Sequence, residues 1–141
     1  MKDFGAEKAK DGVLLAARVL LVVLFLIFGW GKLVDFGGTL GYFTKAGVAL
    51  PSIAAVVAVV MEFPVGIALA LGLLTRPLAL ALAVYTFGAA MLGHPYWTMT
   101  GEAAYMNEIN FYKNIGIIGG LLALYVAGAG KFSVDAKLKL A

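Results

Sequence analysis

The sequence predicts an all-α fold, an antiparallel four-helix transmembrane bundle, and three observations predict it. Of the 141 residues, 62% are hydrophobic and only 13% are charged, with a mean hydropathy of +0.96, whereas a soluble domain carries about 25% charged residues. The apolar residues gather in four runs, each close to the roughly 20 residues that span a bilayer as a helix. Lysine and arginine are unequally divided between the connections. Residues 1–141 therefore form a single membrane domain.

The four predicted helices follow from these runs and their boundaries. They cover about residues 12–33, 51–74, 77–94 and 108–128. Because lipid offers the backbone no hydrogen-bond partner, a spanning segment is either a helix or a strand of a closed barrel, and these runs lack the alternation of barrel strands. The first run is too long for a signal peptide and lacks a small-residue cleavage site, so we expect it to be retained. Pro95 ends the third helix.

The connections between the predicted helices differ in character. The sequence LTRP is a tight turn, which makes the second and third helices antiparallel neighbours. Residues 34–50 are rich in glycine and aromatic residues, which favours an interfacial segment or a short amphipathic helix. After the fourth helix, we expect the tail to lie along the cytoplasmic membrane surface, with Phe132 and Val134 facing the lipid.

Positive charge predicts the topology, because short cytoplasmic connections are enriched in lysine and arginine. One side of the bundle carries Lys2, Lys8, Lys10, Arg18, Arg76, Lys131, Lys137 and Lys139. The other side carries Lys32, Lys45 and Lys113, and a belt of aromatic residues at Trp30, Tyr96, Trp97 and Tyr105. Both termini are therefore predicted to be cytoplasmic.

The composition excludes several kinds of redox and metal centre within this chain. Because there is no cysteine, the chain forms no disulfide, iron–sulfur cluster or catalytic thiolate. The single histidine, His94, does not suffice for a haem held between two histidines of this chain. Sparse basic residues at the ends of apolar runs do not fit nucleic-acid binding. We therefore expect no metal, no fixed cofactor and no nucleic-acid partner.

Glu62 lies near the middle of an apolar stretch, VVAVVMEFPVGIALALG. Steps of four residues from Glu62 reach alanine or glycine at positions 54, 58, 66 and 70, a ridge that lets helices pack closely and directs Glu62 toward protein. Pro64 lacks an N–H, so it leaves the carbonyl of Val60 free and kinks the helix. Because a charge inside the membrane costs roughly 2.5–3.5 kcal/mol, we expect a buried ion pair. Helix lengths leave two partners open, Arg18 and Lys113.

Further polar residues are expected to converge with Glu62 in the outer half of the bundle. The candidate ligand or quinone site consists of Glu62, His94, Lys113, Tyr112, Asn110 and Lys32. The same polar residues also have purely structural interpretations. Arg18 is close enough to the cytoplasmic end to extend to the interface, and Lys32 can anchor a helix end. His94 can hydrogen-bond at a helix end, and an ion pair of Glu62 can simply join helices.

Several short motifs follow one another in a characteristic order. Arg18 and FGWGKL are followed by GVALP, MEFPVGIALALGLLTRPLAL, His94, NEINFYKNIGIIGGLLAL and GAGKFSVD. In this order and spacing the chain resembles the DoxX family of small four-helix bacterial membrane proteins, from about Leu14 to Asp135. The resemblance implies a multi-pass protein of the bacterial inner membrane and a component of quinone-linked oxidation or of an oxidative-stress system. Its motifs include Arg18, Lys32, Glu62 and His94.

Three functional hypotheses follow from the residues and from this resemblance. The first is a membrane subunit of a quinone-linked oxidoreductase, with a polar pocket open to the outer side that takes a quinone or another lipid. A redox partner protein would then bring the electrons. The alternative is a non-enzymatic accessory or scaffold subunit that docks a partner complex. The third is a transport or proton path, for which four helices would need to assemble into a homo-oligomer.

Overall fold

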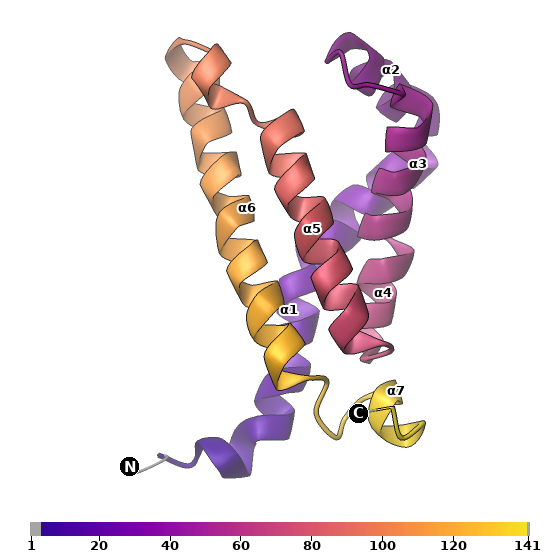
Figure 1. Cartoon of the computed structure of the whole chain (residues 1–141), viewed down its shortest axis with the longest axis vertical. Coiled ribbons are helices and arrows are strands. Elements are labelled where there is room, and N and C mark those ends of the chain that lie inside the picture. The colour runs from indigo at the N-terminus through magenta and orange to yellow at the C-terminus, as the bar shows by residue number, and fades with distance from the viewer. Residues whose placement is uncertain (1–3, 141) are drawn as a thin grey trace.

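The computed structural model describes residues 4–140, and the fold is all-α, as predicted (Figure 1). Four spans are long and apolar enough to cross a membrane. They are α1 (Ala6–Val34), α3 with α4 (Pro51–Glu62 and Pro64–Leu71), α5 (Thr75–Gly93) and α6 (Gly101–Ala127). The shorter elements are α2 (Phe36–Lys45), the 3-10 turn η1 (Tyr96–Thr98) and α7 (Val134–Lys137). Residues 4–140 contain no strand.

The bundle has two unlike ends. In Figure 1, α2 and η1 lie at the upper end, whereas α1 begins and α7 lies at the lower end. We refer to these as the α2 end and the tail end. Helix α5 packs along α6, and α1 packs against both α3 and α4. The interfacial connection predicted for residues 34–50 contains the helix α2, which packs against α3 and the end of α1.

Two spans are longer than the apolar runs that predicted them. Helix α1 begins at Ala6 rather than near residue 12, and α6 begins at Gly101 rather than near residue 108. The additional turns carry exposed charged side chains, such as Lys8 and Glu102. An apolar run marks the part of a helix that suits hydrocarbon, whereas the backbone hydrogen bonds continue into the polar interface. The sequence therefore underestimates the helices at their polar ends.

The second span is interrupted beside Glu62, where Pro64 predicts a kink. Helix α3 ends at Glu62 and α4 begins at Pro64, with Phe63 between them. Helix α1 passes very close to this point. A Cβ atom at Gly29 would lie 2.8 Å from the Cβ of Glu62 and 2.8 Å from the backbone nitrogen of Phe63. Only glycine permits this approach, which places the last turns of α1 beside the Glu62 carboxylate.

An apolar core joins the four spans. Its fully buried members include one side chain from each span, namely Val22, Leu69, Leu82 and Leu121. Phe25, Ala79, Ala83 and Leu124 complete the buried cluster. Many other large apolar side chains on the outside of the bundle are exposed, as expected for helices whose outer surface faces lipid rather than water.

Arg18 connects the first span to the segment that follows α6. Its side chain is fully buried, and its guanidinium donates hydrogen bonds to the carbonyls of Ala129 and Phe132. The structure thus contradicts two interpretations of Arg18, an extension toward water and an ion pair with Glu62. The reason is that the segment after α6 folds back over this face of α1. Its backbone carbonyls then surround the guanidinium, which the linear sequence does not show.

Asp135 fastens the tail to the turn between α4 and α5. Its carboxylate accepts hydrogen bonds from the backbone N–H groups of Leu74, at 2.7 Å, and Thr75, at 2.8 Å. The backbone N–H of Asp135 donates to the carbonyl of Gly72 at 2.8 Å. The carboxylate therefore satisfies free N–H groups at the positive N-terminal end of α5. The tail docks on the protein through this residue, a contact that the sequence analysis does not predict.

Burial and hydrogen bonding shift the pKa of the Asp135 carboxyl in opposite directions. Burial alone would raise its pKa, but the hydrogen bonds from Thr75 and Leu74 and the positive charge of Arg18 hold the pKa below its ordinary value. Since the folded pKa lies below the unfolded value of about 3.9, this stabilisation is complete above that value. It is lost as the pH falls through the folded pKa.

Replacing Asp135 with asparagine is therefore expected to destabilise the protein at neutral pH much more than at pH 3. An amide accepts one of the two hydrogen bonds and presents its NH₂ group to the other N–H. Loss of such a capping side chain costs about 0.5–2 kcal/mol. Melting curves of both proteins in detergent between pH 7 and pH 3 measure the effect, with Glu102→Gln as an exposed control. An equal gap in melting temperature at both pH values would contradict this account.

Candidate functional site

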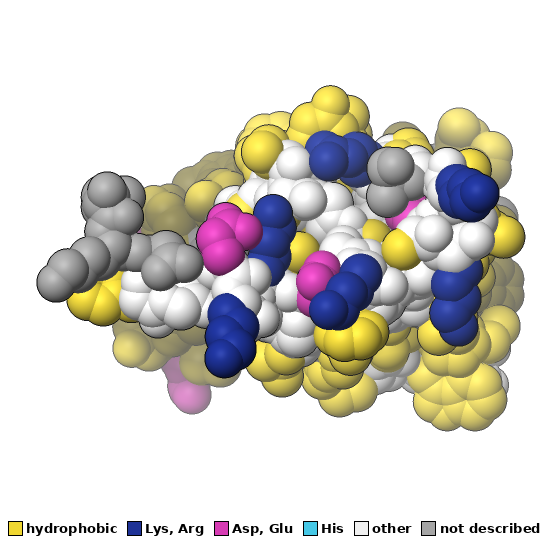
Figure 2. Space-filling view, turned by 90° about the horizontal axis from the view of Figure 1, so that it is seen from below, with side chains coloured by type: hydrophobic (Ala, Val, Ile, Leu, Met, Phe, Trp, Pro, Cys, Tyr) yellow, Lys and Arg dark blue, Asp and Glu magenta, His cyan; other side chains and the backbone are white. Residues whose placement is uncertain are grey.

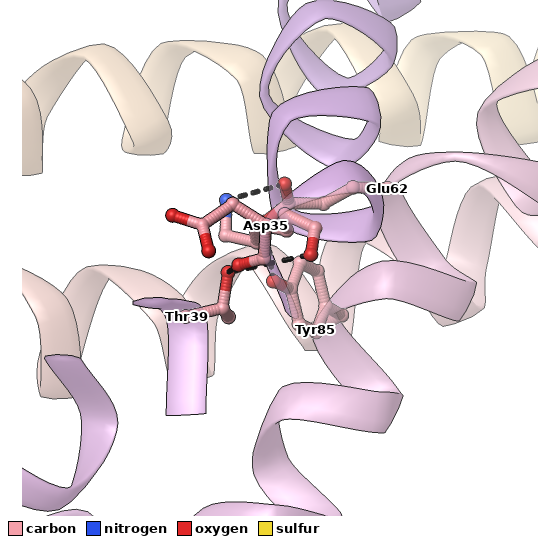
Figure 3. Close-up of polar contacts among 5 residues, drawn as sticks. Asp35, Thr39, Glu62 and Tyr85 are labelled. Carbon is pink, nitrogen blue, oxygen red and sulfur yellow. Dashed lines mark hydrogen bonds and ion pairs between the residues drawn. The ribbon is translucent and has the colours of Figure 1, made fainter. Parts of the chain in front are cut away.

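Glu62 is held by side chains from two other helices. The Nζ atom of Lys32, on α1, lies 2.7 Å from Oε2 of Glu62, and the hydroxyl of Tyr85, on α5, donates to Oε1 at 2.6 Å (Figure 3). Only 10% of the Glu62 side chain and 25% of the Lys32 side chain are exposed. We refer to Lys32, Glu62 and Tyr85 as the Glu62 cluster. Both carboxylate oxygens are thus bonded within a largely buried group that joins three spans.

The ion-pair partner of Glu62 is neither of the two that the sequence analysis left open. Arg18 is engaged near the tail end, and Lys113 donates from Nζ to Oδ1 of Asn110 at 2.7 Å. Counting residues along each helix gives only the depth of a side chain in the membrane. It does not show which helices lie side by side. The close approach at Gly29 decides the pairing, because Lys32 follows one turn later and reaches Glu62 directly.

The junction between α1 and α2 lies next to Lys32. The backbone N–H of Asp35 donates to the carbonyl of Gly31, which closes α1, and the Asp35 carboxylate accepts from the N–H of Gly38 at 2.9 Å, which starts α2. The Thr39 hydroxyl donates to the Asp35 carbonyl at 3.0 Å (Figure 3). These hydrogen bonds set the direction in which α2 leaves α1. Helix α2 thereby borders the Glu62 cluster.

A cavity of about 530 Å³ lies between the spans and α2. Much of its wall is apolar or aromatic, including Phe25, Phe28, Tyr42, Phe43, Val57 and Leu92. Its polar lining consists of Lys32, Glu62, Tyr85, Thr86, His94, Asn110, Lys113 and Asn114. This volume falls within the roughly 300–1,000 Å³ of small-molecule sites, which combine apolar walls with a few polar groups. The cavity is therefore the candidate site.

Five of the six residues predicted for the site line this cavity: Lys32, Glu62, His94, Asn110 and Lys113. His94 follows the last residue of α5, and its Nδ1 lies 3.0 Å from Oδ1 of Asn107. The structural interpretation of His94 as a hydrogen-bonding residue at a helix end therefore describes its contact, while its ring also borders the cavity. Lys32 likewise stands in the last turn of α1, but it pairs with Glu62.

Tyr112 is the predicted site residue that the structure places elsewhere. It does not line the cavity, and 56% of it is exposed. Its ring contacts the rings of Tyr96 and Phe111 in an aromatic group beside η1. In an α-helix, neighbouring residues point about 100° apart, so Tyr112 points away from the direction shared by Asn110, Lys113 and Asn114. Helical periodicity alone therefore separates Tyr112 from the residues that line the cavity.

Three polar lining residues, Tyr85, Thr86 and Asn114, are not among the predicted site residues. The hydroxyl of Thr86 donates to the carbonyl of Leu82 within its own helix, and Asn114 is buried. Tyr85 and Thr86 could have been identified from their position in the sequence, since they interrupt an otherwise apolar run. Polar side chains at that depth usually face the interior of a bundle.

The chemistry available in the cavity is hydrogen bonding and proton exchange. The ammonium of Lys32 presents donors, Glu62 is a proton acceptor, and Asn110, Lys113 and Asn114 present further polar groups from α6. Within residues 4–140, no group of three or more histidine, aspartate or glutamate side chains is placed to hold a metal ion.

Comparison with known proteins places this chain among small membrane proteins. The DoxX family model matches residues 13–95, more than half of the chain. The inner membrane protein YphA of Escherichia coli is 47% identical over 133 residues, which is 94% of each chain. The inner membrane protein YqjF of the same organism is 36% identical over 129 residues, 92% of this chain and 94% of YqjF. The ER-derived vesicles protein ERV29 of Saccharomyces cerevisiae is 31% identical over 135 residues, 95% of this chain and 36% of ERV29. No solved structure matches.

Proposed function

Since this chain belongs to the DoxX family, we propose that it is an inner-membrane protein that binds a quinone or a quinone-like lipid in its cavity. In this role it serves as the membrane subunit of a quinone-linked oxidoreductase or oxidative-stress system. The inner membrane is the location that the names of YphA and YqjF give for those relatives. The four apolar spans support an integral membrane protein.

One observation carries the proposed ligand, namely the Glu62 cluster in the wall of a mostly apolar cavity. A quinone head is a flat apolar ring with carbonyl oxygens at its edge, and it needs aromatic or aliphatic walls and hydrogen-bond donors. Phe25, Phe28 and Val57 supply such walls. Lys32 supplies the donor, since its ammonium keeps two N–H groups beyond the one given to Glu62, whereas the single O–H of Tyr85 is donated to the Glu62 carboxylate.

The proposed chemistry divides between this chain and a partner. Reduction of a quinone to a quinol takes up two electrons and two protons. This chain contributes binding and proton exchange: the Lys32 ammonium bonds a quinone oxygen and gives it a proton, and the ionised Glu62 takes a proton from water and returns it to Lys32. The second proton also comes from water. Asn110 and Lys113 line the same cavity from α6 and offer N–H donors for a second oxygen. The electrons come from a redox protein that docks on the membrane surface.

The proposed topology is antiparallel, with the tail end in the cytoplasm. Figure 2 views the molecule from the tail end, and lysine and arginine side chains are spread across this face. The exposed ones include Lys8, Lys10, Arg76, Lys131, Lys137 and Lys139. An excess of positive charge favours the cytoplasmic side.

We expect purified protein to carry a quinone when its bound lipids are extracted and identified by mass spectrometry without prior selection. Lys113→Met removes an ammonium donor from the cavity, and the loss of one hydrogen bond of about 1–1.5 kcal/mol lowers quinone affinity roughly tenfold. Lys8→Met is the matched control, because Lys8 does not line the cavity and is exposed. Quinone-free protein, or equal retention by both variants, would favour the non-enzymatic scaffold.

A further inference from the structure

We propose that the cavity is open to water at one end only, so that water and protons reach Glu62 from the α2 end and not from the tail end. This inference rests on the cavity of the proposed function, but it does not depend on which ligand the cavity takes. Its basis is the distribution of polar and apolar side chains along all four spans.

Polar side chains continue from Glu62 toward the α2 end. Thr86 and Asn114 border the deeper part of the cavity on α5 and α6. Asn110 and Lys113 follow on α6, and His94 stands where α5 ends. Hydroxyl, amide and ammonium groups at this spacing give water several hydrogen-bond partners, which a water molecule needs in order to occupy a cavity stably.

Below Glu62, toward the tail end, every span presents a buried apolar side chain. Val22 precedes the cavity residue Phe25 by one turn, and Leu82 precedes Thr86 by one turn. Leu69 and Leu121 follow Glu62 and Asn114 by two turns. These four leucine and valine side chains are fully buried in one cluster. A dry layer of this kind holds no water, because it offers no polar partner.

The segment after α6 forms a second barrier to water at the tail end. Arg18 is hydrogen-bonded to the carbonyls of Ala129 and Phe132, and Asp135 is hydrogen-bonded to the turn between α4 and α5. The Arg18 guanidinium and the Asp135 carboxylate near the tail end are thus held by backbone groups, and they are separated from Glu62 by the apolar layer.

The charged and titratable groups around Glu62 agree with entry from the α2 end. Those that share its cavity are Lys32 on α1, Tyr42 on α2, Tyr85 on α5, His94 just after α5, and Lys113 on α6. Helix α4 (Pro64–Leu71) contributes none. Each of these groups lies level with Glu62 or nearer to the α2 end. A quinone reduced in this cavity would therefore take its protons from the compartment at the α2 end.

Thiol labelling tests this inference directly, because the chain has no cysteine of its own. Ala89→Cys places a thiol in the wall of the cavity, and Ala83→Cys places one in the apolar layer of the same helix. A membrane-impermeant thiol reagent is added to either side of sealed vesicles. Two reporters identify the sides, Trp97→Cys in η1 and Lys137→Cys in the tail, both at exposed positions.

We expect A89C to be labelled only from the side that labels W97C. Its rate should exceed that of A83C at least about tenfold, because the reactive thiolate forms in contact with water. Ala54→Cys, in the cavity wall on α3, repeats the measurement should A89C not fold. Labelling from the side of K137C, labelling of A83C as fast as A89C, or no labelling of either cavity thiol would overturn the inference. Quinone-free protein that shows the expected labelling would reject the proposed ligand alone.

Discussion

Replacing Glu62 with glutamine is expected to lower the free energy of unfolding in detergent by about 3 kcal/mol, near the low end for breaking a buried ion pair. The amide cannot compensate the charge of Lys32, whose ammonium would remain in a mostly apolar wall. The loss falls at the low end of that range because a quarter of the Lys32 side chain is exposed. Thermal and denaturant unfolding in one detergent measure it.

A double-mutant cycle identifies the partner. Combining Glu62→Gln with Lys32→Met should recover much of the loss, because no uncompensated charge then remains. We expect a coupling energy of about 1–3 kcal/mol for this pair, within the range for residues in direct contact. The matched control is Lys113→Met, since Lys113 lines the same cavity but bonds to Asn110. Its coupling with Glu62→Gln should be close to zero.

Two results would contradict the ion pair. Unchanged stability of Glu62→Gln would indicate that the carboxyl group is protonated, because glutamine replaces a neutral acid with little loss. Larger coupling to Lys113 or to Arg18 than to Lys32 would reject the pairing itself. Tyr85→Phe offers a further check, since the Tyr85 hydroxyl donates to the other carboxylate oxygen. It should destabilise the protein by about 1 kcal/mol, the value of one hydrogen bond.

The number of spans and the direction in which Glu62 faces could be predicted from the sequence, because each depends on one helix at a time. The length of each apolar run matches the thickness of the bilayer, and the four-residue spacing of small side chains marks the buried face of a helix. Ala58 and Gly66, on either side of Glu62, are buried as that spacing predicts. Periodicity also explains why Asn110 and Lys113 belong to the cavity.

The ion-pair partner could not be predicted, because it depends on how two helices cross. Lys32, Arg18 and Lys113 all carry the right charge, and depth alone does not separate them. The crossing is set by contact between Gly29 and the backbone at Phe63, which involves residues more than thirty positions apart. The docking of the tail could not be predicted for the same reason, because it joins segments that are far apart in the sequence. Asp135 and Thr75 are 60 positions apart in the sequence, and α5 and α6 lie between them.

Replacing Arg18 with methionine is expected to cost about 3 kcal/mol, because a buried carbonyl and a partly buried one lose their donor at roughly 1–3 kcal/mol each. Those carbonyls belong to Ala129 and Phe132, and Asp135 would also lose the positive charge that stabilises its carboxylate. Arg18→Lys should be intermediate, since an ammonium keeps the charge but lacks the planar fork that reaches both acceptors. Melting temperature in detergent measures all three proteins.

Arg76→Met is the matched control, because Arg76 makes the same kind of contact in an exposed position. Its guanidinium donates to the carbonyls of Tyr125 and Val126, at 2.7 and 2.9 Å. Water can replace a donor there, so the expected cost stays below about 1 kcal/mol. Arg18→Met should also release the tail, which limited proteolysis after Lys137 detects. Equal melting temperatures for the two variants, with the tail equally protected, would show that Arg18 does not hold the tail end together.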